Sequence, residues 1–138
     1  SPVVQECAHR YLDGLANVHL IAPLTADEMH NLMARSYLVM TDSGGLQEEA
    51  PALGKPVLVL RRETERPEAV AAGTVQLAGT EEEHIFSMAE TLLKDPAAYA
   101  AMAHAVNPYG DGQACRRIAE GILYHFGLRQ APPDAFGA

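Results

Sequence analysis

Four short apolar runs, separated by stretches with helical spacing, constrain the fold of this chain more than any other feature. The runs cover residues 18–22, 37–41, 57–60 and 74–78. The run at 57–60 is apolar throughout, which is typical of a parallel strand covered on both faces. Alternating strands and helices predict an α/β fold, with a Rossmann-like, mainly parallel sheet flanked by helices. Ligands of such sheets bind beyond the carboxyl ends of the strands, so the loops after residues 22, 41, 60 and 78 are candidate sites.

Helix-start and helix-stop signals divide the remaining segments. Ser1 precedes Pro2 at a first helical position, and Thr25 with Glu28 forms a capping box. Thr80 with Glu83 predicts a second capping box. Later helices are expected at 46–53 in spite of Pro51, from Pro67 to Gly73, after Asp95, and around Ile118, Ile122 and Phe126. In the helix after Thr80, the expected buried stripe consists of Ile85, Met88, Ala89, Leu92 and Leu93.

Composition narrows the classes of partner. The formal net charge is −8, which disfavours a nucleic acid, because binding a phosphate backbone requires clustered basic residues. A single diphosphate remains compatible with this charge, since helix-start amides can bind one anion without basic side chains. No apolar run approaches the roughly 18 residues of a membrane span. The start at Ser1, with no signal peptide, leads us to expect a processed or truncated cytoplasmic chain.

Cysteine and histidine spacing gives no sign of a metal site. Cys7 and Cys115 form no CxxC pair and are expected to be buried, reduced thiols. The six histidines show no HExxH-type spacing. No metal and no other cofactor is therefore expected.

The segment from Thr41 to Gly45 lies where an apolar strand passes into a helix. Its glycines allow the backbone to approach a ligand, and free amides with the Ser43 hydroxyl can bind an anion. Glycine can equally serve to sharpen such a turn, so the residues alone leave both interpretations open. The segment contains neither GxxxxGK[ST] nor GxGxxG, which disfavours a P-loop ATPase or a dinucleotide fold.

Charged residues adjoin two of the candidate loops. Glu48 and Glu49 lie early in the helix after the glycines. Either carboxylate can accept hydrogen bonds from ribose hydroxyls or can simply interact favourably with the helix dipole. Arg61, Arg62 and Arg66 follow the strand at 57–60 and can grip a diphosphate or pair with neighbouring glutamates. Arg66 is the preferred arginine, whereas the residues alone do not choose between Glu48 and Glu49.

Two longer motifs carry a family resemblance. Residues 41–60 read TDSGGLQEEAPALGKPVLVL and are followed by TERPEAV at 64–70, while residues 107–114 read NPYGDGQA. The chain closely resembles the C-terminal domain of non-hydrolysing UDP-N-acetylglucosamine (UDP-GlcNAc) 2-epimerases over about residues 1–126. The resemblance implies the C-terminal half of a two-domain GT-B fold, with the active site between the halves.

This resemblance also implies a reaction and a set of ligands. The family interconverts UDP-GlcNAc and UDP-ManNAc by eliminating UDP and adding it back, with no metal or nicotinamide. By the same resemblance, Ser43, Gly44 and Gly45 contact the diphosphate, Glu49 binds the ribose and Arg66 binds the nucleotide. Uracil contacts are implied around Leu24 and Met29, although the family commonly has an aromatic residue where Met29 stands.

By the same resemblance, the catalytic carboxylates, a lysine and a His-Arg-Arg-Glu-Asn motif lie upstream of Ser1. No catalytic residue is therefore expected here, and residues 1–128 are expected to form a partial UDP-binding domain that is inactive alone. Residues 129–138 are expected to be a flexible tail. The implied partners are UDP or UDP-GlcNAc, the missing N-terminal domain and, for the full-length enzyme, a second copy in a homodimer.

The resemblance implies that two strands of the family's sheet are absent from between 18–22 and 37–41. Unpaired edges around that gap lead us to expect either strand pairing with another chain or a rearranged sheet. Two other functions stay open at this stage: the C-terminal half of a GT-B glycosyltransferase, and a non-catalytic nucleotide-sugar sensor.

Overall fold

A three-stranded parallel sheet lies at the centre of the computed structural model, which describes residues 1–136. The strands β1 (Val39–Thr41), β2 (Val57–Val59) and β3 (Val75–Leu77) lie in chain order. Val57 pairs with both Val39 and Val75, and Leu60 N extends the ladder by donating to Thr41 O at 2.9 Å. Every residue of β2 is buried. The expected α/β fold with a parallel sheet is confirmed.

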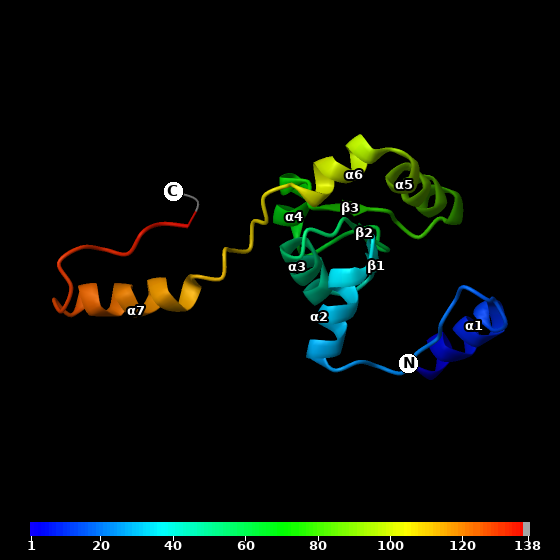
Figure 1. Ribbon diagram of the computed structural model, residues 1–138, viewed down its shortest axis with the longest axis horizontal. Coiled ribbons are helices and arrows are strands. Elements are labelled where there is room, and N and C mark those ends of the chain that lie inside the picture. Colours follow the sequence, from blue (N-terminus) through cyan, green and yellow to red (C-terminus); the bar gives the residue numbers. More distant parts are fainter. Residues whose placement is uncertain (137–138) are drawn as a thin grey trace.

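Helices cover both faces of this sheet (Figure 1). They are α2 (Ala26–Arg35), α3 (Gly44–Ala52), α4 (Pro67–Ala72), α5 (Glu82–Lys94) and α6 (Pro96–Ala103). Val57 and Val59 belong to one core cluster with residues of α2, α3 and α4, whereas Leu58 packs with Leu92 of α5 and Met102 of α6. Since neighbouring strand residues point to opposite faces, β2 contributes to two separate cores.

Several of the predicted helix ends are found. In the Thr25 capping box, Glu28 N donates to Thr25 Oγ1 at 3.4 Å and Thr25 N donates to the Glu28 carboxylate at 2.9 Å. Asp95 caps α6, and Gly73 ends α4 with a left-handed φ of 78°. The prediction of a second capping box is wrong. The N-cap of α5 is Glu81 rather than Thr80, so Glu83 does not lie three residues after the cap.

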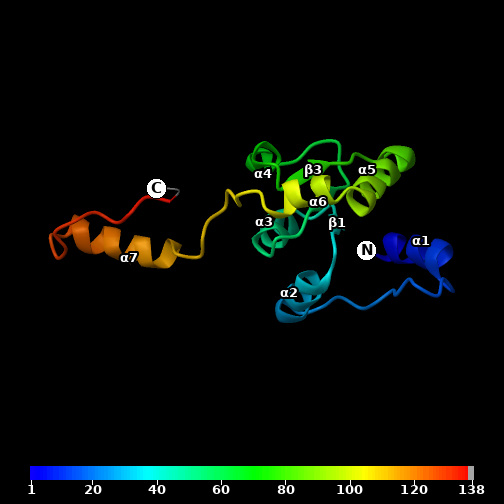
Figure 2. The same ribbon diagram turned by 45° about the horizontal axis from the view of Figure 1, so that its top comes forward.

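Two end helices, α1 (Pro2–Leu12) and α7 (Ala114–His125), lie apart from the sheet in both views (Figures 1 and 2). Neither contains a buried residue. Cys7 on α1 and Cys115 on α7 are both exposed, so the expectation of buried thiols is wrong. The apolar spacing of these helices defined a face, but within the described chain that face is not buried.

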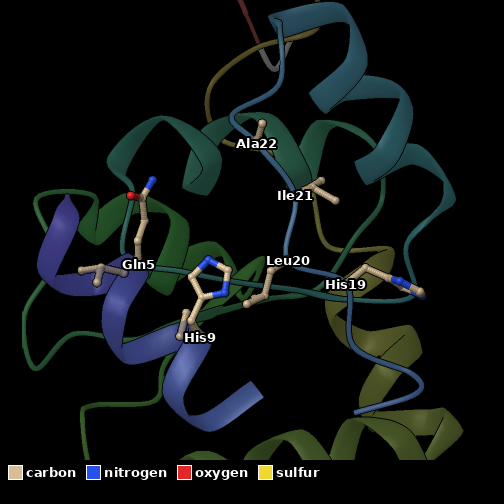
Figure 3. Close-up of a pocket in the computed structure, with 8 residues that line it drawn as sticks. Gln5, His9, His19, Leu20, Ile21 and Ala22 are labelled. Carbon is tan, nitrogen blue, oxygen red and sulfur yellow. The ribbon is translucent and has the colours of Figure 1, made fainter. Parts of the chain in front are cut away.

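The run at 18–22 is extended but forms no strand, which corrects the sequence-based expectation. Val18 N donates to Leu15 O, whereas residues 19–22 make no backbone hydrogen bond within the described residues. A hollow between this segment and α1 is lined by His9, Leu20 and their neighbours (Figure 3). The rearranged sheet is not what the structure shows, because the three strands stay parallel and in chain order. Pairing with another chain stays a prediction.

Two further findings qualify the sequence-based picture. In α5, Leu92 is buried but Leu93 is 64% exposed, so the predicted stripe was one residue too wide. Asp134, in the predicted tail, forms ion pairs with Arg116 and Arg117 of α7, while residues 137–138 of that tail lie outside the described residues.

Among the described helices, none has both the length and the apolar character needed to cross a bilayer.

Candidate functional site

The junction between β1 and α3 forms the base of the site. Thr41 is buried at the end of β1, and its Oγ1 accepts a hydrogen bond from Ser43 N at 3.0 Å, which turns the chain. The helix begins at Gly44, two residues earlier than predicted, so Gly44 and Gly45 belong to its first turn. Ser43 is the N-cap residue, yet its side chain makes no capping hydrogen bond. The uncapped first turn can therefore donate its amides to an anion.

Gly44 allows the loop at residues 61–66 to approach this helix start closely. A Cβ at Gly44 would lie 2.7 Å from Glu65 Oε1 and 3.9 Å from a terminal nitrogen of Arg66. A Cβ at Gly45 would lie 3.6 Å from Glu49 Oε1. The structure thus brings Ser43 and both glycines close to Glu49 and Arg66, while their role in binding a ligand stays a prediction.

Arg66 is already paired with a carboxylate. Its Nε donates to Glu48, and this hydrogen bond is the main cause that raises the pKa of the Arg66 guanidinium. Arg66 Nη1 also donates to Glu65 O at 3.2 Å. Glu48, which the sequence left as an alternative to Glu49, therefore acts on the arginine. An anionic ligand has to share or displace this contact.

The other two arginines of the loop show the pairing that the sequence left open. Arg61 contacts the Glu65 carboxylate at 2.8 Å, and Arg62 contacts Glu81 at 3.0 Å. The pKa of Glu65 lies below its usual range, first because of a hydrogen bond from its own amide and then because of the charges on Arg61 and Arg66. Both arginines thus have carboxylate partners at the same rim of the sheet.

Glu49 connects the site to α2. Its Oε2 lies 3.1 Å from Nε2 of His30, which follows Met29 on α2. Met29 is partly buried and packs against the core cluster that α3 shares. Leu24 is half-buried just before the α2 N-cap, Thr25.

Three residues near the site were missed by the sequence analysis. Gln47 of α3 is fully buried, and its amide bonds to Ser43 O and to the Thr64 hydroxyl. The Tyr109 hydroxyl is buried without a hydrogen-bond partner among the described residues, and burial, followed by the charges of Glu68 and Glu48, raises its pKa. All three lie in the quoted motifs, but the motifs alone do not reveal which side chains meet.

Comparison with known proteins places this geometry in a family. The family model described as UDP-N-acetylglucosamine 2-epimerase matches residues 1–123. The UDP-N-acetylglucosamine 2-epimerase of Bacillus subtilis is 57% identical over 136 residues, covering 99% of this chain and 36% of the relative. That of Escherichia coli K12 is 54% identical over 122 residues, covering 88% and 32% respectively. The chain thus spans about a third of the length of these curated relatives.

Solved structures agree with that placement. A crystal structure of UDP-N-acetylglucosamine 2-epimerase superposes with a TM-score of 0.93 at 56% identity, covering 100% of this chain and 37% of that one. The Neisseria meningitidis UDP-GlcNAc 2-epimerase bound to UDP-GlcNAc gives a TM-score of 0.83 at 48% identity, covering 90% and 34%. A Staphylococcus aureus MnaA–UDP structure gives 0.90 at 45% identity, covering 99% and 38%. These matches confirm the expected C-terminal part of a GT-B fold.

Proposed function

The chain belongs to the UDP-N-acetylglucosamine 2-epimerase family, and we propose that it supplies the UDP-binding part of an enzyme that interconverts UDP-GlcNAc and UDP-ManNAc. The activity is proposed for the complete polypeptide that carries these residues, since the chain spans about a third of its relatives. Nucleotide binding by this fold suits an epimerase and a glycosyltransferase equally. The family match is therefore what favours an epimerase.

The observation that carries the proposal is the uncapped first turn of α3, with Arg66 and Glu49 beside it. We assign the diphosphate to the amides of Gly44 and Gly45 and to the Ser43 hydroxyl. Arg66 supplies a positive charge at the same place. Donors already aimed at the anion stabilise the negative charge that develops on UDP as it leaves the sugar.

The remaining contacts follow from the neighbouring helices. The Glu49 carboxylate lies beside Gly45, where it can accept hydrogen bonds from ribose hydroxyls. The uracil is assigned to the region of Leu24 and Met29, with Met29 offering an apolar surface in place of an aromatic ring. Met29 is packed against the core, which gives the base a fixed wall.

The proposed reaction removes the proton from the sugar carbon that carries the acetamido group and breaks the bond between the anomeric carbon and UDP. UDP then returns to the anomeric carbon, while a proton is added to the opposite face of the carbon that carries the acetamido group. In this scheme, these residues hold the leaving group, and the groups that move protons at the sugar belong to the N-terminal domain. The chain alone is therefore expected to bind UDP weakly, because Glu48 competes for Arg66, and to show no turnover. A homodimeric, cytoplasmic full-length enzyme stays a prediction.

Isothermal titration calorimetry tests the assignment. UDP is titrated into the chain and into a variant carrying Ser43→Ala and Glu49→Ala, and the double variant is expected to lose roughly tenfold or more in affinity. Arg62→Ala is the matched control, because Arg62 lies on the loop at residues 61–66 but pairs with Glu81. This variant is expected to bind UDP as the wild type does. Equal heats for wild type and the double variant would remove the assigned site.

A further inference from the structure

We propose that Gln47 and Thr64 are positioning residues that fix Arg66 relative to the diphosphate loop through a chain of three hydrogen bonds. The inference rests on the proposed function, because it assigns a task to two side chains that do not themselves reach the nucleotide. Its starting point is a buried amide that joins two separate loops of the sheet rim.

Gln47 is the centre of this hydrogen-bond chain. It is 0% exposed, and its Nε2 donates to Ser43 O at 3.2 Å while its Oε1 accepts from Thr64 Oγ1 at 2.5 Å. Thr64 Oγ1 in turn accepts from Arg66 N at 3.0 Å. The Thr64 hydroxyl has one proton to donate and lone pairs that accept, so it can make both hydrogen bonds at the same time. The polarity is therefore consistent from the Arg66 amide to the Ser43 carbonyl.

Each end of the hydrogen-bond chain positions a protein group that is proposed to contact the diphosphate. The peptide bond between Ser43 and Gly44 is planar, so holding Ser43 C=O also sets the direction of the Gly44 N–H, a proposed diphosphate donor. At the other end, the bond to Arg66 N fixes the backbone from which the guanidinium extends. Gln47 and Thr64 thus couple the amide side of the anion site to its cationic side.

Burial makes this coupling sensitive to a single missing atom. With Gln47 fully buried and Thr64 half-buried, water cannot readily replace a lost partner, and an unpaired buried polar group is costly. A purely structural role would make the same bonds without any effect on the nucleotide. The test has to separate these two roles.

The test uses the complete polypeptide that carries these residues and measures UDP affinity by calorimetry. Thr64→Val removes the hydroxyl while keeping the branched shape, and Thr64→Ser keeps the hydroxyl. We expect the valine variant to bind UDP about tenfold more weakly and the serine variant to stay within about twofold of wild type. Gln47→Glu, which loses the donor to Ser43 O, is expected to resemble Thr64→Val.

An Arg66→Ala background separates positioning from general stability. If Thr64 acts through Arg66, the loss caused by Thr64→Val largely disappears once Arg66 is absent. A loss of equal size in both backgrounds, with a matching drop in melting temperature, overturns the inference. So does wild-type affinity in Thr64→Val.

Failure of the inference can be told from failure of the proposed function. Wild-type protein that binds no UDP, or Arg66→Ala protein that binds it as tightly as wild type, overturns the function and this inference together. Arg66→Ala that weakens binding while Thr64→Val does not leaves the function standing and removes the positioning role alone.

Discussion

Helices α2 and α5 of the central segment and the end helices α1 and α7 carry the same kind of amphipathic pattern, yet only α2 and α5 contain buried residues. Every residue of the buried hydrophobic core identified in the described chain falls between Met33 and Met102, whereas α1 and α7 contain no buried residue. In the centre, both faces of β2 are covered by helices close in sequence. The difference teaches that spacing shows where a helix has an apolar face, but a partner decides whether that face is buried.

Thiol reactivity offers the largest expected contrast between the two regions. Cys7 on α1 and Cys115 on α7 are expected to react with a colorimetric thiol reagent in the folded 138-residue chain. A cysteine placed by Val59→Cys in β2, where exposure is 0%, should react only when the sheet opens. With a typical opening free energy of about 5 kcal/mol or more, its rate should be on the order of a thousandfold lower. Similar rates at all three thiols would contradict the burial difference.

Truncating one apolar side chain in each region gives the next largest contrast. Leu58→Ala removes a fully buried side chain that faces Leu92 and Met102, and is expected to lower the free energy of unfolding by about 2–5 kcal/mol. Ile118→Ala in α7, where Ile118 is 62% exposed, should change it by no more than about 0.5 kcal/mol. Urea unfolding followed by circular dichroism measures both. Equal losses would show that α7 belongs to the same cooperative core.

Adding one methyl group in each region tests the site. Gly44→Ala places a Cβ against Glu65 Oε1, so the Glu65 carboxylate must move, and the new methyl group lies beside the proposed diphosphate donors. UDP binding is therefore expected to weaken by about tenfold. Gly121→Ala in α7 meets Pro133 Cγ at an ordinary 3.8 Å. It should leave UDP affinity unchanged and favour the helix by up to about 1 kcal/mol. Calorimetry measures the UDP affinity of both variants. Wild-type affinity in Gly44→Ala would show that the close approach of Glu65 to Gly44 does not affect ligand binding.

The smallest expected effect concerns the ion pairs that join α7 to its flanking loops. Arg117 lowers the pKa of Asp111 by hydrogen bonding, and Arg116 is the main cause that lowers the pKa of Asp134 to about 2. Because both folded pKa values are depressed, their stabilisation is fully present above the ordinary carboxyl pKa of about 4 and is lost as pH falls through the folded values. Acid should therefore loosen this end of α7 before it affects the uncharged sheet core.

Nuclear magnetic resonance can follow that loss at one amide. Gln113 N donates to Asp111 Oδ1 at 3.0 Å, so its proton resonance should titrate with a midpoint well below the ordinary carboxyl pKa. Asp111→Asn is expected to abolish the titration. A midpoint near 4 would mean that the pair with Arg117 does not persist in solution.

The central region was also the region that the sequence predicted well. The runs at 37–41, 57–60 and 74–78 became strands because each pairs with a neighbour inside the chain. The run at 18–22 has the same apolar character but no backbone partner among the described residues, so its pattern alone was misleading. The same reasoning explains why Cys7 and Cys115 were expected inside and lie outside.

At the candidate site, residue types were predictable but partnerships were not. The glycines and Arg66 could be singled out because they lie in loops that parallel strands bring to one rim, whereas Glu49 was preferred to Glu48 only through the family resemblance. The bond of Glu48 to Arg66 and the buried position of Gln47 depend on how residues 61–66 fold back over α3. Such contacts join residues 17 or 18 positions apart, beyond the reach of local spacing.

The shortness of α3 has a practical consequence for measuring binding. Its nine residues span about 13 Å, so the helix carries the proposed site at one end and the partly exposed Leu53 cap at the other. A fluorophore attached through Leu53→Cys, with Cys7 and Cys115 replaced by serine, would sit near enough to sense a change in the helix. The body of α3 would keep the dye out of the nucleotide's path. Binding could then be read optically, without labelling the ligand.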